Sequence, residues 1–535
     1  MNGPSRRGLL GGAVLAGGAA ALPASPARAA APVAGPVTVY PADPRYQELT
    51  VGYNQRWVGS PDYVRVVSST AQVVTAVQEA VDAGKRISVV SGGHCLAPFV
   101  FNPEVEVVID LSGLDEVSFD ARRNAFAVEG GARLSGVYDT LYKKWGVTIP
   151  GGMCPTVGIG GHATGGGYGF LSRQSGAVID HLAAVEVVVV DRSGTARAVI
   201  ASRDPADPHH DLWWACTGGG GGSFGIVTRF WFRTPGASGA DPGRLLVNPP
   251  KDVLLSAVGI PWSALDRAKF TTLVTNWGAW YEQHAAPASP ARILSGVASL
   301  AHRSSGNVFL LTQVDATASG ADRLLGDYLG ALTAGLGVDA VVAAQPPQRL
   351  PWLRAVKLIA AGIPSFINPT LRGSSKSAYL RRSYTPEQAG AMYDALTRTG
   401  FANPAAAVTL AGFSGGAINA VPPSRTALAH RDAAFWTLFE TQWRDPAGDA
   451  ANIGWLRELY ASVWSATGGY PVPGDQADGC YVNNPDPDIT DPAFNRSGVP
   501  WHTLYHKANY PRLQQVKAAY DPRDVFRHAQ SVALP

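Results

Sequence analysis

Apolar and polar positions along the first half of the chain alternate between strand and helix patterns. Helical spacing of apolar residues runs over residues 71–83, between a Ser69 N-cap and Gly84, and again over residues 134–144. Strand patterns surround these helices and cover residues 63–67, 87–90, 105–111, 125–129, 185–190 and 224–232. This order predicts a small α/β unit over residues 62–110, followed by further strands.

The second half of the chain combines the two patterns differently. Glycine and proline cluster over residues 235–250, which predicts a domain boundary there. Beyond it, helices are expected over residues 319–333 and 386–399, and strands over 307–314, 406–412 and 435–442. We interpret this part as an α+β domain with an antiparallel sheet. A helix over residues 510–520 closes a loop-rich final segment.

Composition limits the class of protein. The chain has 535 residues, so two or three domains are expected, and 46% hydrophobic residues exclude a mostly disordered chain. The net charge is +3, without long lysine or arginine runs, which argues against a nucleic-acid partner. The 60 glycines and 40 prolines follow no period, so a collagen-like chain is excluded.

Residues 1–35 have the features of a twin-arginine export signal. Arg6 and Arg7 precede an apolar stretch that begins at Gly8, and Ala27 and Ala29 place small residues at a cleavage site. The stretch is too short and too rich in glycine for a membrane anchor, and no later segment reaches ~18 uninterrupted apolar residues. We therefore expect a secreted protein without a membrane anchor.

Four cysteines bear on redox and metal chemistry, namely Cys95, Cys154, Cys216 and Cys480. An exported protein could pair them in two disulfides, and the sequence leaves open whether Cys216 and Cys480 pair. No Cys-x-x-Cys spacing occurs, so no metal site is expected.

Three glycine-rich clusters indicate that backbone comes close to a ligand. They are residues 91–94 (Ser-Gly-Gly-His), 158–167 and 218–222, and each lies beside an expected strand. Glycine allows backbone N–H groups to approach phosphate oxygens, so together the clusters predict a dinucleotide pocket. Gly158, Gly160 and Ala163 imitate the Rossmann fingerprint, but no buried strand leads into them, which excludes that motif.

These clusters belong to a longer pattern. It consists of residues 91–94, residues 154–162 (Cys-Pro-Thr-Val-Gly-Ile-Gly-Gly-His), 165–169 (Gly-Gly-Gly-Tyr-Gly), Arg173, 211–225, 376–381 (Lys-Ser-Ala-Tyr-Leu-Arg), 509–513 and 521–526. The pattern resembles the berberine-bridge-enzyme-like FAD oxidases, which are flavoproteins of the vanillyl-alcohol-oxidase type. The resemblance covers essentially the whole mature chain and is strongest to exported or antibiotic-tailoring members.

The resemblance implies a fold and a cofactor. The fold is α+β, with a two-lobed FAD-binding domain from residues 36–235 and 480–535. A substrate domain, residues 236–479, has an antiparallel sheet covered by helices. FAD is implied to be held covalently by His94 and Cys154, and Val157 matches the small residue that leaves the flavin open to O2. The remaining implied cofactor-binding residues are Ser91, Gly92, Gly93, Gly158, Gly160, Gly161, His162, Gly165, Gly166, Gly225, Ile226, Val227 and Asn483.

The sequence departs from its family where a catalytic base is expected. The usual tyrosine positions are Asn484 and Ser414, and a third polar position falls on or near Leu438. Oxidation of an alcohol needs a base for the hydroxyl proton, and an amide cannot serve. The candidates for the catalytic residues are Tyr168, Tyr481 and Glu440, with Tyr505 and His506 as further possible bases. Glu440 shares strand parity with Trp436 and Leu438, which predicts that it faces a ligand.

The substrate is indicated only indirectly. Six aromatic residues fit either a ligand pocket or the core of the substrate domain: Trp277, Trp280, Tyr281, Trp436, Phe439 and Trp443. The first hypothesis is an exported oxidase that transfers electrons from a sugar, a glycosylated natural product or another secondary metabolite to O2. The alternatives are a flavin-binding protein with little turnover and a dehydrogenase with another acceptor. The oligomeric state is left open.

Overall fold

The first part of the chain builds two sheets. The computed structural model describes residues 35–363 and 367–535, so the predicted export signal, except for Gly35, lies outside the described residues. In the first sheet the order is β1-β2-β4-β3, and β2, β4 and β3 run parallel while β1 pairs antiparallel. Its elements are β1 (Val37–Val39), α1 (Tyr46–Leu49), β2 (Tyr63–Val66), α2 (Thr70–Asp82), β3 (Ile87–Val90) and β4 (Val107–Asp110).

The helix α2 forms the crossover that two parallel strands require. Ser69 caps its N-terminus by accepting a hydrogen bond from the Gln72 N–H at 3.2 Å. The buried side of α2, which includes Val73, Ala76 and Val77, packs with β3 and β4 residues in one apolar cluster. This is the small α/β unit that the sequence predicts.

The second sheet is antiparallel throughout, with the order β5-β6-β9-β7-β8. The connections between its strands carry two of the glycine clusters, residues 158–167 and 218–222, and the short helices beside them, while the cluster at 91–94 follows β3 of the first sheet. Its elements are β5 (Val117–Asp120), β6 (Ala125–Glu129), α3 (Leu134–Trp145), α4 (Ile159–Thr164), α5 (Ser172–Ser175), the 3-10 helix η1 (Val178–His181), β7 (Leu182–Val190), β8 (Ala196–Ser202), α6 (His210–Ala215) and β9 (Ile226–Phe232).

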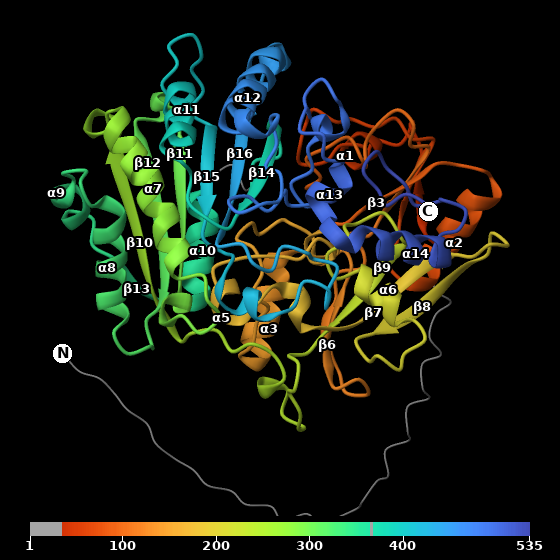
Figure 1. The fold of residues 1–535 in the computed structure, drawn as a ribbon. Coiled ribbons are helices and arrows are strands. Elements are labelled where there is room, and N and C mark those ends of the chain that lie inside the picture. The colour runs from red at the N-terminus through yellow and green to blue at the C-terminus, as the bar shows by residue number, and fades with distance from the viewer. Residues whose placement is uncertain (1–34, 364–366) are drawn as a thin grey trace, which may run out of the picture. The chain divides into compact units, whose positions relative to one another are not determined.

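The third sheet has seven antiparallel strands in the order β13-β10-β12-β11-β15-β16-β14, and Figure 1 shows helices gathered along it. Its strands are β10 (Asp252–Pro261), β11 (Leu294–Ala301), β12 (Asn307–Asp315), β13 (Gln348–Pro351), β14 (Arg372–Leu380), β15 (Ala406–Ala411) and β16 (Phe435–Trp443). The helices of this part are α7 (Arg267–Gln283), α8 (Ala321–Thr333), α9 (Asp339–Ala343), α10 (Trp352–Gly362), α11 (Pro386–Leu396), the 3-10 helix η7 (Gly416–Ala420) and α12 (Asp449–Val463).

The seven-stranded sheet separates an apolar core from a cavity. Along β16, Phe435 and Phe439 enter the core that α7, α8, α11 and α12 cover, while Trp436, Leu438 and Glu440 face the cavity. The same alternation continues on β11 and β15, as the side-chain period of two requires. The predicted fold class, α+β with an antiparallel sheet covered by helices, is confirmed.

The end of the chain returns to the first two sheets. Leu513 of α14 (Tyr510–Tyr520) packs in the core of the second sheet, and Phe526 packs beside α2. The helix α13 (Trp501–His506) precedes α14, and the two are in contact. Residues 36–535 form one compact unit, so the expected domain bounds at 235 and 479 stay predictions.

The cysteines do not pair as the sequence analysis allowed. Among the described residues, which include all four cysteines, there is no disulfide. Cys216 is buried in the core of the second sheet and Cys480 in the core of the third, so separate cores hold these two apart. Cys95 and Cys154 lie on the wall of the cavity, which Cys216 also reaches, whereas Cys480 does not line it.

Candidate active site

A cavity of about 970 Å³ lies between the glycine-rich loops and the open face of the seven-stranded sheet. This volume is at the upper end of the range for ligand sites. Gly165 and Gly166 do not line it: a Cβ on Gly165 would collide with the Asn483 side chain, and one on Gly166 would contact Leu428. The predicted residues that do line it are Ser91, Gly92, Gly93, His94, Cys154, Val157, Gly158, Gly160, Gly161, His162, Tyr168, Gly225, Ile226, Val227, Glu440, Tyr481 and Asn483.

The glycine loops touch each other backbone to backbone. A Cβ on Gly92 would lie 2.1 Å from the backbone nitrogen of Gly158, so neither loop tolerates a side chain there. Gly225 has a φ of +153° and would place a Cβ 2.4 Å from the Val188 carbonyl oxygen. These close contacts leave backbone rather than side chains on this part of the wall. Such a wall fits the phosphate-bearing part of a dinucleotide.

His94 and Cys154 are brought together through one threonine. The Oγ1 of Thr156 lies 2.9 Å from His94 Nε2 and 3.6 Å from Cys154 Sγ. The ring of Tyr53 stacks on His94, with centroids 4.4 Å apart. Burial lowers the pKa of His94 to about 4, helped by the nearby Arg133, so the imidazole is neutral near pH 7.

Three tyrosines meet beside this wall. The rings of Tyr168 and Tyr481 lie 5.2 Å apart, and Tyr379 donates a hydrogen bond from its hydroxyl to that of Tyr168 at 3.2 Å. The Tyr481 hydroxyl accepts hydrogen bonds from the Gly167 N–H and the Asn483 amide. Burial raises the pKa of Tyr481 to about 12 and raises that of Tyr168 further, so both are protonated near neutral pH.

Glu440 reaches the cavity from the centre of β16. Its carboxylate accepts a hydrogen bond from Thr409 of β15 at 3.2 Å and has no ion pair within the described residues. Burial raises its pKa to about 7, which the Thr409 hydrogen bond opposes. Glu440 is therefore the residue of the three candidates that exchanges a proton near neutral pH.

The positions at which the family has a tyrosine or another polar residue do not all reach the cavity. Asn484 and Leu438 line the cavity, whereas Ser414 is fully buried outside it. Tyr505 also lines the cavity, and its hydroxyl accepts a hydrogen bond from the Asp486 N–H. His506 lies outside the cavity wall, and burial lowers its pKa to about 3.

The expected aromatic pocket is mostly core. Trp436 alone of the six aromatic residues lines the cavity, where its ring lies 6.0 Å from that of Tyr481. Trp443 is buried at the end of β16, on the core side of the alternation. The other four pack in the apolar core under the helices: Trp277, Trp280, Tyr281 and Phe439.

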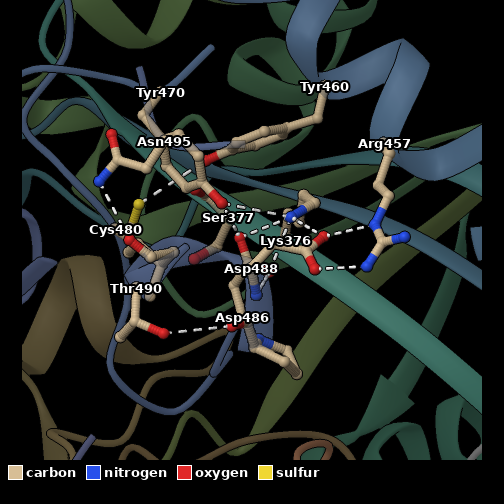
Figure 2. Close-up of polar contacts among 12 residues, drawn as sticks. Lys376, Ser377, Arg457, Tyr460, Tyr470, Cys480, Asp486, Asp488, Thr490 and Asn495 are labelled. Atoms are coloured by element: carbon tan, nitrogen blue, oxygen red, sulfur yellow. Dashed lines mark hydrogen bonds and ion pairs between the residues drawn. The ribbon is translucent and has the colours of Figure 1, made fainter. Parts of the chain in front are cut away.

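A buried lysine anchors the segment that carries Tyr481 and Asn483. Lys376 of β14 donates to both carboxylate oxygens of Asp486 at 2.7 Å and to Asp488 at 2.9 Å (Figure 2). Tyr470 donates to Asp486 at 2.7 Å, and Arg457 of α12 binds both oxygens of Asp488. This lysine cluster is almost inaccessible to solvent at Lys376 and Asp486.

The lysine cluster is connected to the cavity by the chain itself. Asn484 and Pro485, which line the cavity, directly precede Asp486. Gln530, another lining residue, donates to the Asp486 carbonyl at 2.6 Å. The Tyr481 N–H donates to Ser377 Oγ on β14 at 3.0 Å. The cluster therefore positions one wall of the cavity.

Several of these residues carry no sequence signal. Tyr53 stands in an irregular segment without a motif, and Thr409 is an ordinary strand residue. Thr156 and Tyr379 lie inside the motifs at residues 154–162 and 376–381, but no pattern around them indicates a role. Within residues 35–363 and 367–535, no cluster of His, Cys, Asp and Glu suits a metal ion. No helix in the described part has the length and apolarity to span a membrane.

The fold and the cavity define an FAD-linked oxidoreductase. The family described as FAD binding domain matches residues 61–198, and the one described as Berberine and berberine like matches residues 480–533. The chain belongs to the berberine-bridge-enzyme-like family of FAD-linked oxidoreductases. The resemblance stated from the motifs is thus confirmed.

Three relatives illustrate the similarity. Aclacinomycin-N/aclacinomycin-A oxidase of Streptomyces galilaeus is 47% identical, over 100% of this chain and 99% of the relative. Hexose oxidase of Chondrus crispus is 28% identical, over 92% of this chain and 93% of the relative. The crystal structure of a glycopeptide hexose oxidase complexed with teicoplanin superposes with a TM-score of 0.87 at 45% identity, covering 94% of this chain and 100% of that one.

Proposed function

We propose that the protein is an exported oxidase that binds FAD through two covalent bonds and oxidises a hydroxyl group of a glycosylated natural product. The observation that carries this proposal is the position of His94 and Cys154, both beside Thr156, on a cavity that continues onto a sheet face carrying Glu440 and Gln442. The twin-arginine pattern of residues 1–35 supports export of the protein.

The attachment proposal rests on the chemistry of two side chains. His94 presents a neutral imidazole because burial disfavours its charged form, and a neutral ring nitrogen has the lone pair that bond formation needs. Cys154 supplies a thiol on the same wall. When bound, FAD would supply a hydride acceptor, and its reoxidation would give two electrons and two protons to O2 to form H2O2.

Glu440 is proposed as the base. Oxidation of an alcohol removes a hydride from carbon and a proton from oxygen, and the carboxylate takes this proton. A pKa of about 7 leaves much of Glu440 ionised near neutral pH. Tyr168 and Tyr481 stay protonated and serve as hydrogen-bond partners of the substrate hydroxyl. This division of roles removes the need for a tyrosine at Asn484.

The polar groups of the sheet face support a sugar-bearing substrate. Trp436, Glu440 and Gln442 line the cavity along one face of β16, over ~20 Å of strand at ~3.4 Å per residue. Trp436 Nε1, Gln442 Oε1 and Asn484 Oδ1 have no hydrogen-bond partner in the described residues. These groups suit the hydroxyls of an elongated ligand, and the relatives named above include two hexose oxidases.

The attachment is tested on acid-denatured protein by absorbance and intact mass, with His94→Ala, Cys154→Ala and the double variant in parallel. We expect one FAD to stay with the wild-type chain and with each single variant, but not with the double variant. Flavin that washes away from the wild type would overturn the covalent proposal. A Cys480→Ala control, which changes a buried thiol outside the cavity wall, should retain the flavin.

The oxidase reaction is tested by mixing the flavin-loaded protein with glycosylated compounds, first without O2 and then with it. We expect the flavin to bleach on mixing and to recover with stoichiometric H2O2 when O2 is added. Bleaching without recovery would indicate a dehydrogenase with another acceptor. No bleaching with any sugar, glycopeptide or anthracycline glycoside would favour a flavin-binding protein with little turnover.

A further inference from the structure

A second cavity, which we call the arginine cavity, has no role in the proposed reaction. Its volume is about 1000 Å³, and none of its lining residues lines the cavity that contains His94 and Cys154. Five arginines surround it: Arg122, Arg123, Arg203, Arg233 and Arg425. This is a strong concentration of positive charge in a chain whose net charge is only +3.

The arginines come from four separate parts of the chain. Arg122 and Arg123 lie in the turn between β5 and β6, and Arg203 and Arg233 directly follow β8 and β9. Arg425 lies in the segment after η7. Because distant segments converge, the fold itself gathers these charges.

Three of these arginines are not neutralised by carboxylates. Arg203, Arg233 and Arg425 make no ion pair within the described residues. Arg203 donates a hydrogen bond to the Arg233 carbonyl at 3.2 Å, and this neutral acceptor leaves the charge of Arg203 uncompensated. The Nε of Arg233 is buried without a hydrogen-bond partner in the described residues. Burial lowers the pKa of Arg203, and the charges of Arg233 and Arg425 lower it further, as expected for guanidinium groups that repel each other.

Two aspartates line the cavity, but each has other contacts. Asp180 pairs with Arg431, a buried residue outside the cavity wall, at 2.7 Å. Asp204 is exposed and accepts the Ala206 N–H at 2.9 Å. Asp180 also accepts the Ala177 N–H at 2.8 Å, as part of the hydrogen bonding that holds η1.

We propose that the arginine cavity is a binding site for a multivalent oxyanion of the phosphate class. A guanidinium presents N–H donors in a planar fork that matches phosphate oxygens, and several forks around one cavity favour an anion with two or more charges. Binding would relieve the repulsion among Arg203, Arg233 and Arg425. The site is separate from the proposed oxidase reaction, so either proposal can fail alone.

The test is titration of the flavin-loaded protein with inorganic pyrophosphate by calorimetry, at an ionic strength held constant with NaCl. Flavin-loaded protein is used so that the glycine loops do not offer a competing phosphate site. We expect saturable binding to one site. Arg203→Gln and Arg425→Gln should each weaken it at least tenfold. Arg425 is exposed, so its variant remains informative if Arg203→Gln does not fold.

The matched control is Arg323→Gln, which removes the same charge from an exposed side chain on α8. The dissociation constant of pyrophosphate from this variant should stay within twofold of the wild-type value. Absence of saturable binding to the wild type would overturn the proposal. So would an equal loss of affinity in Arg323→Gln, because that result would mean that only the overall charge attracts the anion.

Discussion

The buried lysine cluster allows a quantitative prediction about Lys376→Met. This change removes the ammonium that contacts Asp486 and Asp488 but keeps an apolar chain of similar length. Asp488 retains Arg457, while Asp486 keeps only neutral donors, namely the Tyr470 hydroxyl and the Asp488 N–H. The variant therefore leaves Asp486 as a buried carboxylate without a counter-ion.

The magnitude follows from the geometry. At 2.7 Å and an effective dielectric constant of ~20, the gross attraction between Lys376 and Asp486 is ~6 kcal/mol. Removal of one partner from a buried pair costs ~3–5 kcal/mol, because the remaining charge stays desolvated. We expect the free energy of unfolding to fall by this amount, which corresponds to about a 200-fold to 5000-fold change in the folding equilibrium.

The assay is urea denaturation followed by circular dichroism, with reversibility checked by dilution. Lys376→Met combined with Asp486→Asn should recover more than half of the loss, since the double variant buries no unpaired charge. Lys143→Met, which breaks an exposed pair with Asp139 on α3, should cost less than ~0.5 kcal/mol. A loss below ~1 kcal/mol in Lys376→Met, or no recovery in the double variant, would refute the reasoning.

Three further predictions concern the reaction. Substrate-driven flavin reduction should rise with pH through about 7 as Glu440 loses its proton, and Glu440→Gln should abolish this rise and lower the rate ~10²–10⁴-fold in stopped-flow traces. Tyr481→Phe should slow reduction but keep the rise near pH 7, because its pKa of about 12 places its titration elsewhere; loss of the rise would reassign the base. Val157→Ile should slow flavin reoxidation by O2 while anaerobic reduction stays unchanged, and equal reoxidation rates would exclude a gating role for this position.

The sequence predicts the fold best where apolar positions follow a clear period. The alternation in β16 identifies both the strand and the face that Glu440 occupies. The same reasoning does not predict the strand β14. Five of its nine residues, including Lys376, are polar or charged, and yet nearly the whole strand is buried. Its burial depends on Asp486 and Asp488, which lie more than a hundred positions further along the chain, so no local pattern reports it.

In the candidate site, too, the sequence predicts residues that lie in short motifs and misses those placed only by tertiary packing. His94 and Cys154 are recognisable because short motifs surround them, and both lie on the cavity wall. Tyr53 and Thr409 have no such motif, since their contacts with His94 and Glu440 arise only from tertiary packing. Gly165 was expected at the cofactor but packs against Asn483, because a glycine pattern does not distinguish contact with a ligand from contact with a neighbouring side chain.

The cavity wall combines the loop of His94 with the segment from Tyr481 to Gln530. The ribosome makes these two parts at widely separated times, ~20–80 s apart at ~5–20 residues per second. Until the later segment emerges and Asp486 reaches Lys376, the glycine loops are exposed on one side. A nascent chain therefore contains His94, Cys154 and the three glycine clusters well before it holds the residues that complete the wall around a flavin.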